Sequence, residues 1–137
     1  MTDTTADLTN LPATGQFFEQ GNYAPVPDEL TDYDLPVEGA IPPELDGWYL
    51  RNGPNPRESS AHWFTGDGMV HGLRLDEGRA AWYRNRWVRS APVMSAMGEP
   101  VSEHSVGTFG PNTNVIGHGG RTFAIVEAGP APFEVTS

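Results

Sequence analysis

The chain has 137 residues, 37% of them hydrophobic and 10% aromatic, which is enough for one domain with a core and leaves little room for a second. Its 18 acidic residues outnumber 8 arginines, and the net charge of -10 argues against a nucleic-acid partner, because such a surface repels phosphate. The absence of cysteine excludes disulfides and thiolate metal ligands. No apolar run approaches the roughly 20 residues of a membrane span, and no signal-peptide pattern is present, so a cytoplasmic protein is expected.

The N-terminal third is acidic and rich in proline. Residues 1–14 are small and polar and are expected to form a disordered tail. Residues 15–46 are expected to form an extended arm laid over a surface, because proline removes a backbone donor and biases its predecessor towards extended geometry.

From residue 47 onward the apolar residues alternate with period two, which predicts β-strands. A strand over 48–52 ends at the proline-rich turn 53–56. Two hairpins are expected after this strand. No helix of ordinary length is expected anywhere in the chain. The hairpins pair 69–75 with 80–88 around Asp76–Gly78, and 113–116 with 122–127 around 117–120, with a long loop over 92–111 between them. The fold class is therefore all-β, and periodicity alone does not choose between a sandwich, a barrel and propeller blades.

The densest cluster of metal-ligating residue types contains His62, Asp67 and His71. Imidazole and carboxylate suit iron or zinc, so a small metal hydrolase is one hypothesis. The favoured alternative is structural: Gly66–Gly68 forms a tight turn, and both histidines lie at strand ends. A nine-residue spacing across a turn rarely directs two imidazoles at one point. The other two histidines, His104 and His118, are expected to face solvent.

Two other features leave alternatives open. Arg84, Arg86 and Arg89 form a cationic stripe. Arg84 and Arg86 share a strand face and could bind a carboxylate or phosphate, although pairing of these arginines with acids of this chain is the simpler expectation. Glu127 follows the apolar run 123–126. It is either a buried carboxylate with partners that offset its desolvation or a solvent-facing residue at a strand end. No phosphate-binding loop or nucleophile elbow occurs, so nucleotide hydrolysis and acyl transfer have no support.

Taken together, several segments are more specific than any one of them alone. In order and spacing they resemble the N-terminal part of the carotenoid cleavage oxygenase family, over about residues 21–137. These segments are 45–56 (LDGWYLRNGPNP), 62–71 (HWFTGDGMVH), 82–89 (WYRNRWVR), 111–115 (PNTNV) and 121–129 (RTFAIVEAG).

The resemblance implies a seven-bladed β-propeller whose axis carries an iron(II) ion held by four histidines. Such enzymes cleave a conjugated C=C bond with O2 into two carbonyl products. Blades of about 40–45 residues allow this chain about three at most, so a partial propeller over 47–137 is expected. In the family the iron ligands follow the segment ending at Glu127. The chain is therefore expected to be an inactive fragment that binds no metal alone, with Fe(2+) bound only by the full-length protein.

The resemblance also implies roles for four residues. Glu127 matches a glutamate that accepts the free N–H of an iron-bound histidine, and Thr113 matches a small residue near the open iron site. Phe64 matches an aromatic residue of the substrate tunnel. Val126 stands where other members carry lysine or tryptophan, which favours an apolar isoprenoid over a phenol.

The expected partners are thus an apolar conjugated substrate and O2, with peripheral membrane contact of the full-length enzyme for substrate extraction. In a partial ring, the strand from Trp82 to Val88 is expected to lack an outer neighbour. The alternative hypothesis is a small stand-alone β domain that binds an apolar ligand or a partner protein.

Overall fold

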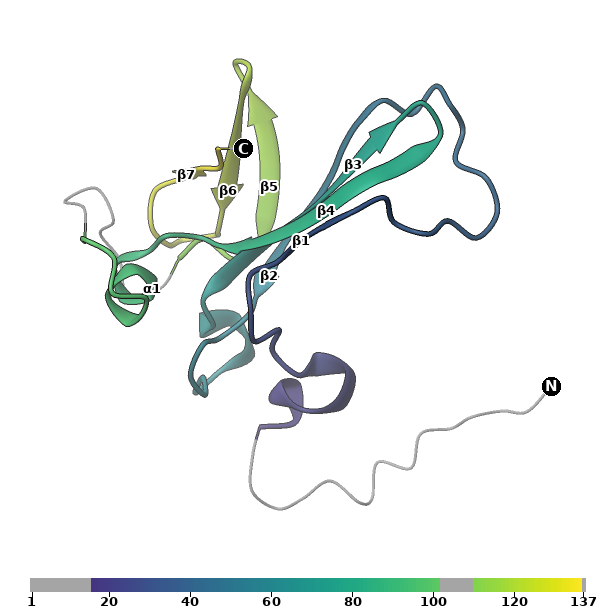
Figure 1. Ribbon diagram of the computed structural model, residues 1–137. Coiled ribbons are helices and arrows are strands. Elements are labelled where there is room, and N and C mark those ends of the chain that lie inside the picture. Colours follow the sequence, from purple (N-terminus) through teal and green to yellow (C-terminus); the bar gives the residue numbers. More distant parts are fainter. Residues whose placement is uncertain (1–15, 102–109, 137) are drawn as a thin grey trace.

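The computed structural model describes residues 16–101 and 110–136, which form two antiparallel sheets (Figure 1). The expected tail 1–14 and His104 lie outside the described residues. The first sheet contains β1 (Thr31–Tyr33), β2 (Gly47–Pro54), β3 (Gly68–Asp76) and β4 (Arg79–Trp87). The second contains β5 (Asn114–His118), β6 (Arg121–Ile125) and β7 (Phe133–Glu134). The helical segments are η2 (Phe17–Glu19), η3 (Gly21–Tyr23), η4 (Trp63–Thr65) and α1 (Ala91–Ala96).

The β3–β4 hairpin forms the centre of the first sheet, whose strand order is β1-β4-β3-β2. Its two turn residues, Glu77 and Gly78, have φ values of 45° and 79°. Two successive positive φ angles match the twist of the strands that they join. The predicted hairpin is confirmed, with glycine at a positive-φ position.

The outer edge of β4 is covered, so the prediction that it lacks a neighbour is wrong. Strand β1 pairs antiparallel with it, with Thr31 opposite Arg84 and Tyr33 opposite Trp82. The buried Asn85 extends the attachment, accepting a hydrogen bond from Leu30 N (2.7 Å) and donating to the backbone of the same segment. The domain boundary at residue 47 stays a prediction, but the preceding arm supplies a strand to the sheet that follows.

The second sheet, in the order β5-β6-β7, stands beside the first, and the two diverge from a common base (Figure 1). The predicted second hairpin is confirmed, with Gly119 and Gly120 at positive φ in its turn. Buried Val70 of β3 and buried Val88, which directly follows β4, pack with buried Ala124 of β6. Apolar residues from adjacent sheets thus form the core between them.

Helix α1 occupies part of the predicted loop 92–111 and places Val93 in a second core with Met69 and Trp87. Ser90 stands at its N-cap position, Pro92 lies in its first turn, and Gly98 follows it with φ 70°. These are ordinary start and stop signals that the periodicity analysis missed. Within the described ranges no helix is long and apolar enough to cross a membrane.

Candidate functional site

The segment 111–114 links the two sheets and is fixed by Asn112, which is 3% exposed. The Asn112 side-chain amide donates to the carbonyl oxygens of Phe64 (2.9 Å) and Gly66 (2.8 Å). Both acceptors belong to the η4 turn, 48 and 46 residues earlier in the chain. A buried amide that donates twice to backbone holds these two loops in one arrangement.

A second amide holds the same segment from β2. Asn52 Nδ2 donates to the carbonyl oxygens of Pro111 (3.0 Å) and Asn114 (3.2 Å), on either side of Thr113. The Thr113 backbone N–H donates to Ile125 O at 3.1 Å. Thr113 is thereby held at the junction between β2 and the β5–β6 hairpin. The sequence analysis gave Asn52 and Asn112 no role, although both lie inside the segments that carry the family resemblance.

The side chains of Thr113 and Glu127 meet at this junction. The Thr113 hydroxyl donates to Glu127 Oε2 at 2.9 Å, with Asn112 Oδ1 as a longer acceptor at 3.4 Å. Glu127 is exposed just beyond β6, so the solvent-facing interpretation is the one the structure bears out. It has a hydrogen-bond partner without being buried.

The resemblance also marks Phe64 and Val126, and each is connected to the Thr113–Glu127 pair in a different way. Phe64 is 72% exposed on η4, and its carbonyl is the one that Asn112 holds. Val126 is half-buried and directly precedes Glu127. Asn112 therefore connects the turn of Phe64 to the Thr113–Glu127 pair, while Val126 joins the group through its place in the chain. The predicted substrate and catalytic roles stay predictions.

His62, Asp67 and His71 each have a different local partner. His62 Nδ1 accepts from Phe64 N (3.2 Å), and Asp67 Oδ2 accepts from Arg57 N (3.2 Å). His71 Nδ1 lies 2.6 Å from the hydroxyl oxygen of Tyr83. Across the part of the chain that the structure describes, no three His, Cys, Asp or Glu side chains are grouped to hold a metal ion. These contacts favour the structural interpretation of the cluster over the metal hydrolase, but His71 lies inside β3, paired with Arg51 and Asn85, and not at a strand end as expected.

Arg84 and Arg86 both bond to the hydroxyl of Thr31, at 3.1 and 3.0 Å. Of the three arginines in the predicted stripe, Arg89 pairs with acids as expected, contacting Glu29 at 2.5 Å and Glu99 at 3.0 Å. Among the described residues neither Arg84 nor Arg86 forms an ion pair, so the expectation of acidic partners for them is wrong. They attach the N-terminal arm through β1 instead.

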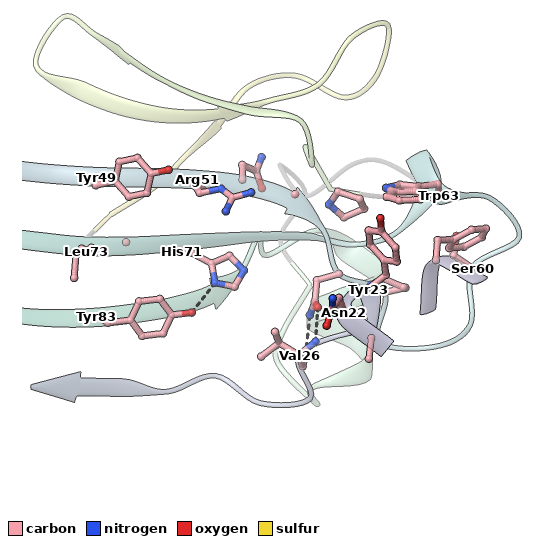
Figure 2. A pocket seen from close by; sticks show the side chains of 18 of the residues that line it. Asn22, Tyr23, Val26, Tyr49, Arg51, Ser60, Trp63, His71, Leu73 and Tyr83 are labelled. Atoms are coloured by element: carbon pink, nitrogen blue, oxygen red, sulfur yellow. Dashed lines mark hydrogen bonds between the residues drawn. The ribbon is translucent and has the colours of Figure 1, made fainter. Parts of the chain in front are cut away.

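A groove of about 680 Å³ opens on the face of the first sheet that carries His71, between that face and the η3 and η4 segments (Figure 2). Burial lowers the pKa of His71, and the nearby charge of Arg51 lowers it further. Burial also raises the pKa of Tyr83. Both side chains are therefore neutral near pH 7. The groove's far wall is fixed by Asn55, which exchanges two hydrogen bonds with the Val26 backbone at 2.7 and 2.9 Å.

Comparison with solved structures identifies the fold. A lignostilbene dioxygenase from Pseudomonas brassicacearum matches with a TM-score of 0.72 and 24% identity, over 90% of this chain and 29% of that one. An apocarotenoid oxygenase from Synechocystis matches with a TM-score of 0.65 and 25% identity, over 82% of this chain and 28% of that one. The two sheets are therefore part of a carotenoid oxygenase β-propeller, and the predicted fold class is confirmed.

Sequence comparison identifies the family. A protein-family model described as RPE65, retinal pigment epithelial membrane protein, matches residues 23–135. A carotenoid cleavage oxygenase of Mycobacterium tuberculosis is 54% identical over 126 residues, which are 85% of this chain and 25% of that protein. A carotenoid 9,10(9',10')-cleavage dioxygenase of Crocus sativus is 47% identical over 75 residues, or 52% of this chain and 14% of that protein. The chain belongs to the RPE65 and carotenoid oxygenase family, and it spans about a quarter of the length of the mycobacterial relative.

Proposed function

We propose that this chain is the N-terminal part of an Fe(II)-dependent dioxygenase. The enzyme would cleave a conjugated C=C bond of a carotenoid or apocarotenoid with O2 and give two carbonyl products. The relatives named for carotenoid cleavage support the substrate class. The single observation that carries the role of this segment is the 2.9 Å hydrogen bond between Thr113 and Glu127, which joins two residues that the resemblance marks 14 positions apart in the chain.

In this proposal the iron is held by histidines outside the described segment, and Glu127 accepts the N–H of one of them. The donor set fits that role. Thr113 occupies Oε2 of the carboxylate, while Oε1 accepts no hydrogen bond from a described residue. A carboxylate that accepts from a metal-bound histidine fixes the orientation and tautomer of the ring. When bound, iron supplies the redox chemistry that reaction with O2 requires.

The chain's own side chains would position Glu127 and bind the substrate. The Thr113 hydroxyl directs the carboxylate, and the small size of the side chain limits the space beside the open iron position. Exposed Phe64 offers an aromatic ring to a flat polyene. Val126 offers no polar group, which favours an isoprenoid over a phenol. The proposal also includes a cytoplasmic enzyme that takes its apolar substrate at a membrane surface.

A chimera tests this function. Residues 16–136 of the present chain replace the corresponding N-terminal quarter of the mycobacterial relative, with which they share high identity. The purified chimera is assayed for bound iron, for O2 uptake, and for aldehyde products from carotenoid and apocarotenoid substrates. We expect iron binding and cleavage.

Two variants of the chimera complete the test. Glu127→Gln keeps the shape of the side chain but removes the charge that favours the histidine N–H, and should reduce turnover about 10–100-fold. Glu38→Gln, in an exposed loop, makes the same chemical change away from the site and should have no effect. A chimera whose turnover and iron content are unchanged by Glu127→Gln would refute the proposed role of this carboxylate.

A further inference from the structure

The Asn52 side chain links the first sheet to the segment that enters the second. Asn52 lies in β2, at one edge of the first sheet, opposite Val70 in the β2–β3 register. Its amide nitrogen donates to the carbonyl oxygens of Pro111 (3.0 Å) and Asn114 (3.2 Å), which are 59 and 62 residues away in the chain. Pro111 precedes β5, and Asn114 is its first residue. One side-chain amide, with a proton for each acceptor, thus spans the junction of the sheets.

The orientation of this amide is determined by its two acceptors. If its nitrogen and oxygen exchanged places, the oxygen would face two carbonyl oxygens, and both hydrogen bonds would be replaced by repulsion. Asn52 Oδ1 is buried and accepts no hydrogen bond from a described residue. Within residues 16–101 and 110–136, the hydrogen bonds of this side chain therefore all go to the 111–114 segment.

The two acceptors lie on either side of Thr113 and restrict its backbone. The Pro111 carbonyl is also confined by close packing, because a Cβ atom on Gly68 would lie 2.1 Å from its oxygen. The Thr113 N–H donates to Ile125 O at 3.1 Å, which fixes the same residue against β6. From this position the Thr113 hydroxyl reaches Glu127 Oε2 at 2.9 Å. Paired strands on both sides are the support that holds a functional side chain in a precise place.

We propose that Asn52 is a positioning residue for the reaction: by fixing the Thr113 backbone, its amide keeps the Thr113 hydroxyl bonded to Glu127. This role rests on the proposed function, in which Glu127 orients a histidine that binds iron. Asn52 acts through Thr113, because both of its donors are used on backbone carbonyls. The amide, its acceptors and the carboxylate all belong to the described residues, so their arrangement can be measured without iron.

The first measurement uses the 137-residue chain without iron. Three-bond couplings to the Thr113 methyl carbon report the rotamer of this side chain, and hydrogen exchange reports the protection of the Asn52 side-chain amide. We expect one Thr113 rotamer, and Asn52 amide protons that exchange at least about tenfold more slowly than those of the exposed Asn22. Asn52→Leu keeps a similar size but removes both donors, and should give averaged Thr113 rotamers. Asn22→Leu is the matched control and should leave the Thr113 couplings unchanged.

The second measurement uses the chimera with the mycobacterial relative and distinguishes positioning from a general effect on stability. Asn52→Leu should lower turnover per bound iron about tenfold, because the carboxylate loses its fixed orientation. Since Asn52 acts through the Thr113 hydroxyl, Asn52→Leu should cost less than about twofold more in a chimera that already carries Thr113→Val. Two residues that act independently would instead lower turnover about a hundredfold together.

Three results would each overturn this role of Asn52. They are wild-type Asn52 amide protons that exchange as fast as those of Asn22, a single Thr113 rotamer in Asn52→Leu, and independent effects in the double variant. A chimera that neither binds iron nor cleaves carotenoids would refute the proposed function, while the couplings and exchange rates would still decide whether Asn52 positions Thr113. If Asn52→Leu does not fold, Asn52→Asp, which has the shape of asparagine, replaces it in both measurements.

Discussion

The Thr113 hydroxyl donates a 2.9 Å hydrogen bond to Glu127 Oε2 across the open end of the β5–β6 hairpin. The family resemblance treats these residues separately, one as a small group near the iron and the other as a carboxylate behind a histidine. We expect this contact to give Thr113 a second role, which is to orient the carboxylate. The methyl group and the hydroxyl of one side chain can thus be tested apart.

We expect the hydroxyl of Thr113 to matter more than its methyl group. In the chimera, Thr113→Val keeps the shape but removes the donor, and should lower turnover about tenfold because Glu127 loses its fixed orientation. Thr113→Ser keeps the donor and should retain most of the activity. Steady-state O2 uptake and bound iron measure both effects. If Thr113→Ser were the more damaging change, steric restriction would be the main role of this residue.

The Asn112 amide is expected to be essential for the link between η4 and the 111–114 segment. Asn112→Asp has the same shape but cannot donate to Phe64 O and Gly66 O, and it places a buried carboxylate against two carbonyl oxygens. Each unsatisfied buried acceptor costs about 1–3 kcal/mol, so the free energy of unfolding should fall by at least that amount.

Urea denaturation measures the loss of stability in Asn112→Asp, and hydrogen exchange over residues 63–66 shows whether the η4 turn is released. The matched control is Asn114→Asp, because the Asn114 side chain is exposed. Similar unfolding curves for the two variants would contradict the role of Asn112.

Alternating apolar residues and turn glycines predicted both hairpins correctly. These signals are sufficient because one buried face and a two-residue turn with positive φ angles determine a hairpin from neighbouring residues alone. Strand β1 could not be predicted in the same way. Its three residues have no measurable period. They pair with β4 along the chain, where Asn85 holds the residues just before the strand and two arginines of β4 bond to Thr31.

The site was predictable only to the extent that the family resemblance marks its residues. The resemblance gives Glu127 and Thr113 their predicted roles, but it marks none of the asparagines whose amides hold this region, because an amide has no charge, periodicity or titration to signal a role. Four asparagines bond to distant backbone and hold the arm, the sheets and the site together. They are Asn52, Asn55, Asn85 and Asn112. Each acts through partners at least 29 residues away, which local patterns cannot show.

Gly68 is expected to be irreplaceable because of close packing with the 111–114 segment. A Cβ atom at Gly68 would lie 2.1 Å from the carbonyl oxygen of Pro111. Gly68→Ala should therefore displace one of the two segments and destabilise the fold by about 1–3 kcal/mol. Gly53→Ala is the control, since no atom lies within 4 Å of its Cβ position. Thermal unfolding compares the variants. Equal midpoints of thermal unfolding for Gly68→Ala and Gly53→Ala would show that the two backbone segments can move apart without loss of stability.

The last prediction concerns the ion pair that anchors the N-terminal arm to the end of β4. Glu29 accepts hydrogen bonds from Arg89 (2.5 and 3.0 Å) and from Trp87 N (2.8 Å). Burial raises the pKa of Glu29, but the Arg89 and Trp87 bonds and the charges of Arg89 and Arg86 outweigh it, so the pKa lies below its usual 4.5. A carboxyl whose pKa is lowered by folding stabilises the protein above its unfolded pKa and ceases to do so as pH falls through its folded pKa.

Glu29→Gln should therefore be less stable than the wild type at pH 7, by about 1–3 kcal/mol, because two charge-assisted bonds are weakened. The difference should shrink as the pH falls below about 4.5 and the wild-type carboxyl becomes protonated. Urea denaturation at a series of pH values measures this convergence. Glu38→Gln, in an exposed loop, should follow the wild type throughout. A Glu29→Gln deficit that stays constant down to about pH 3 would show that the side chain contributes by packing rather than by its charge.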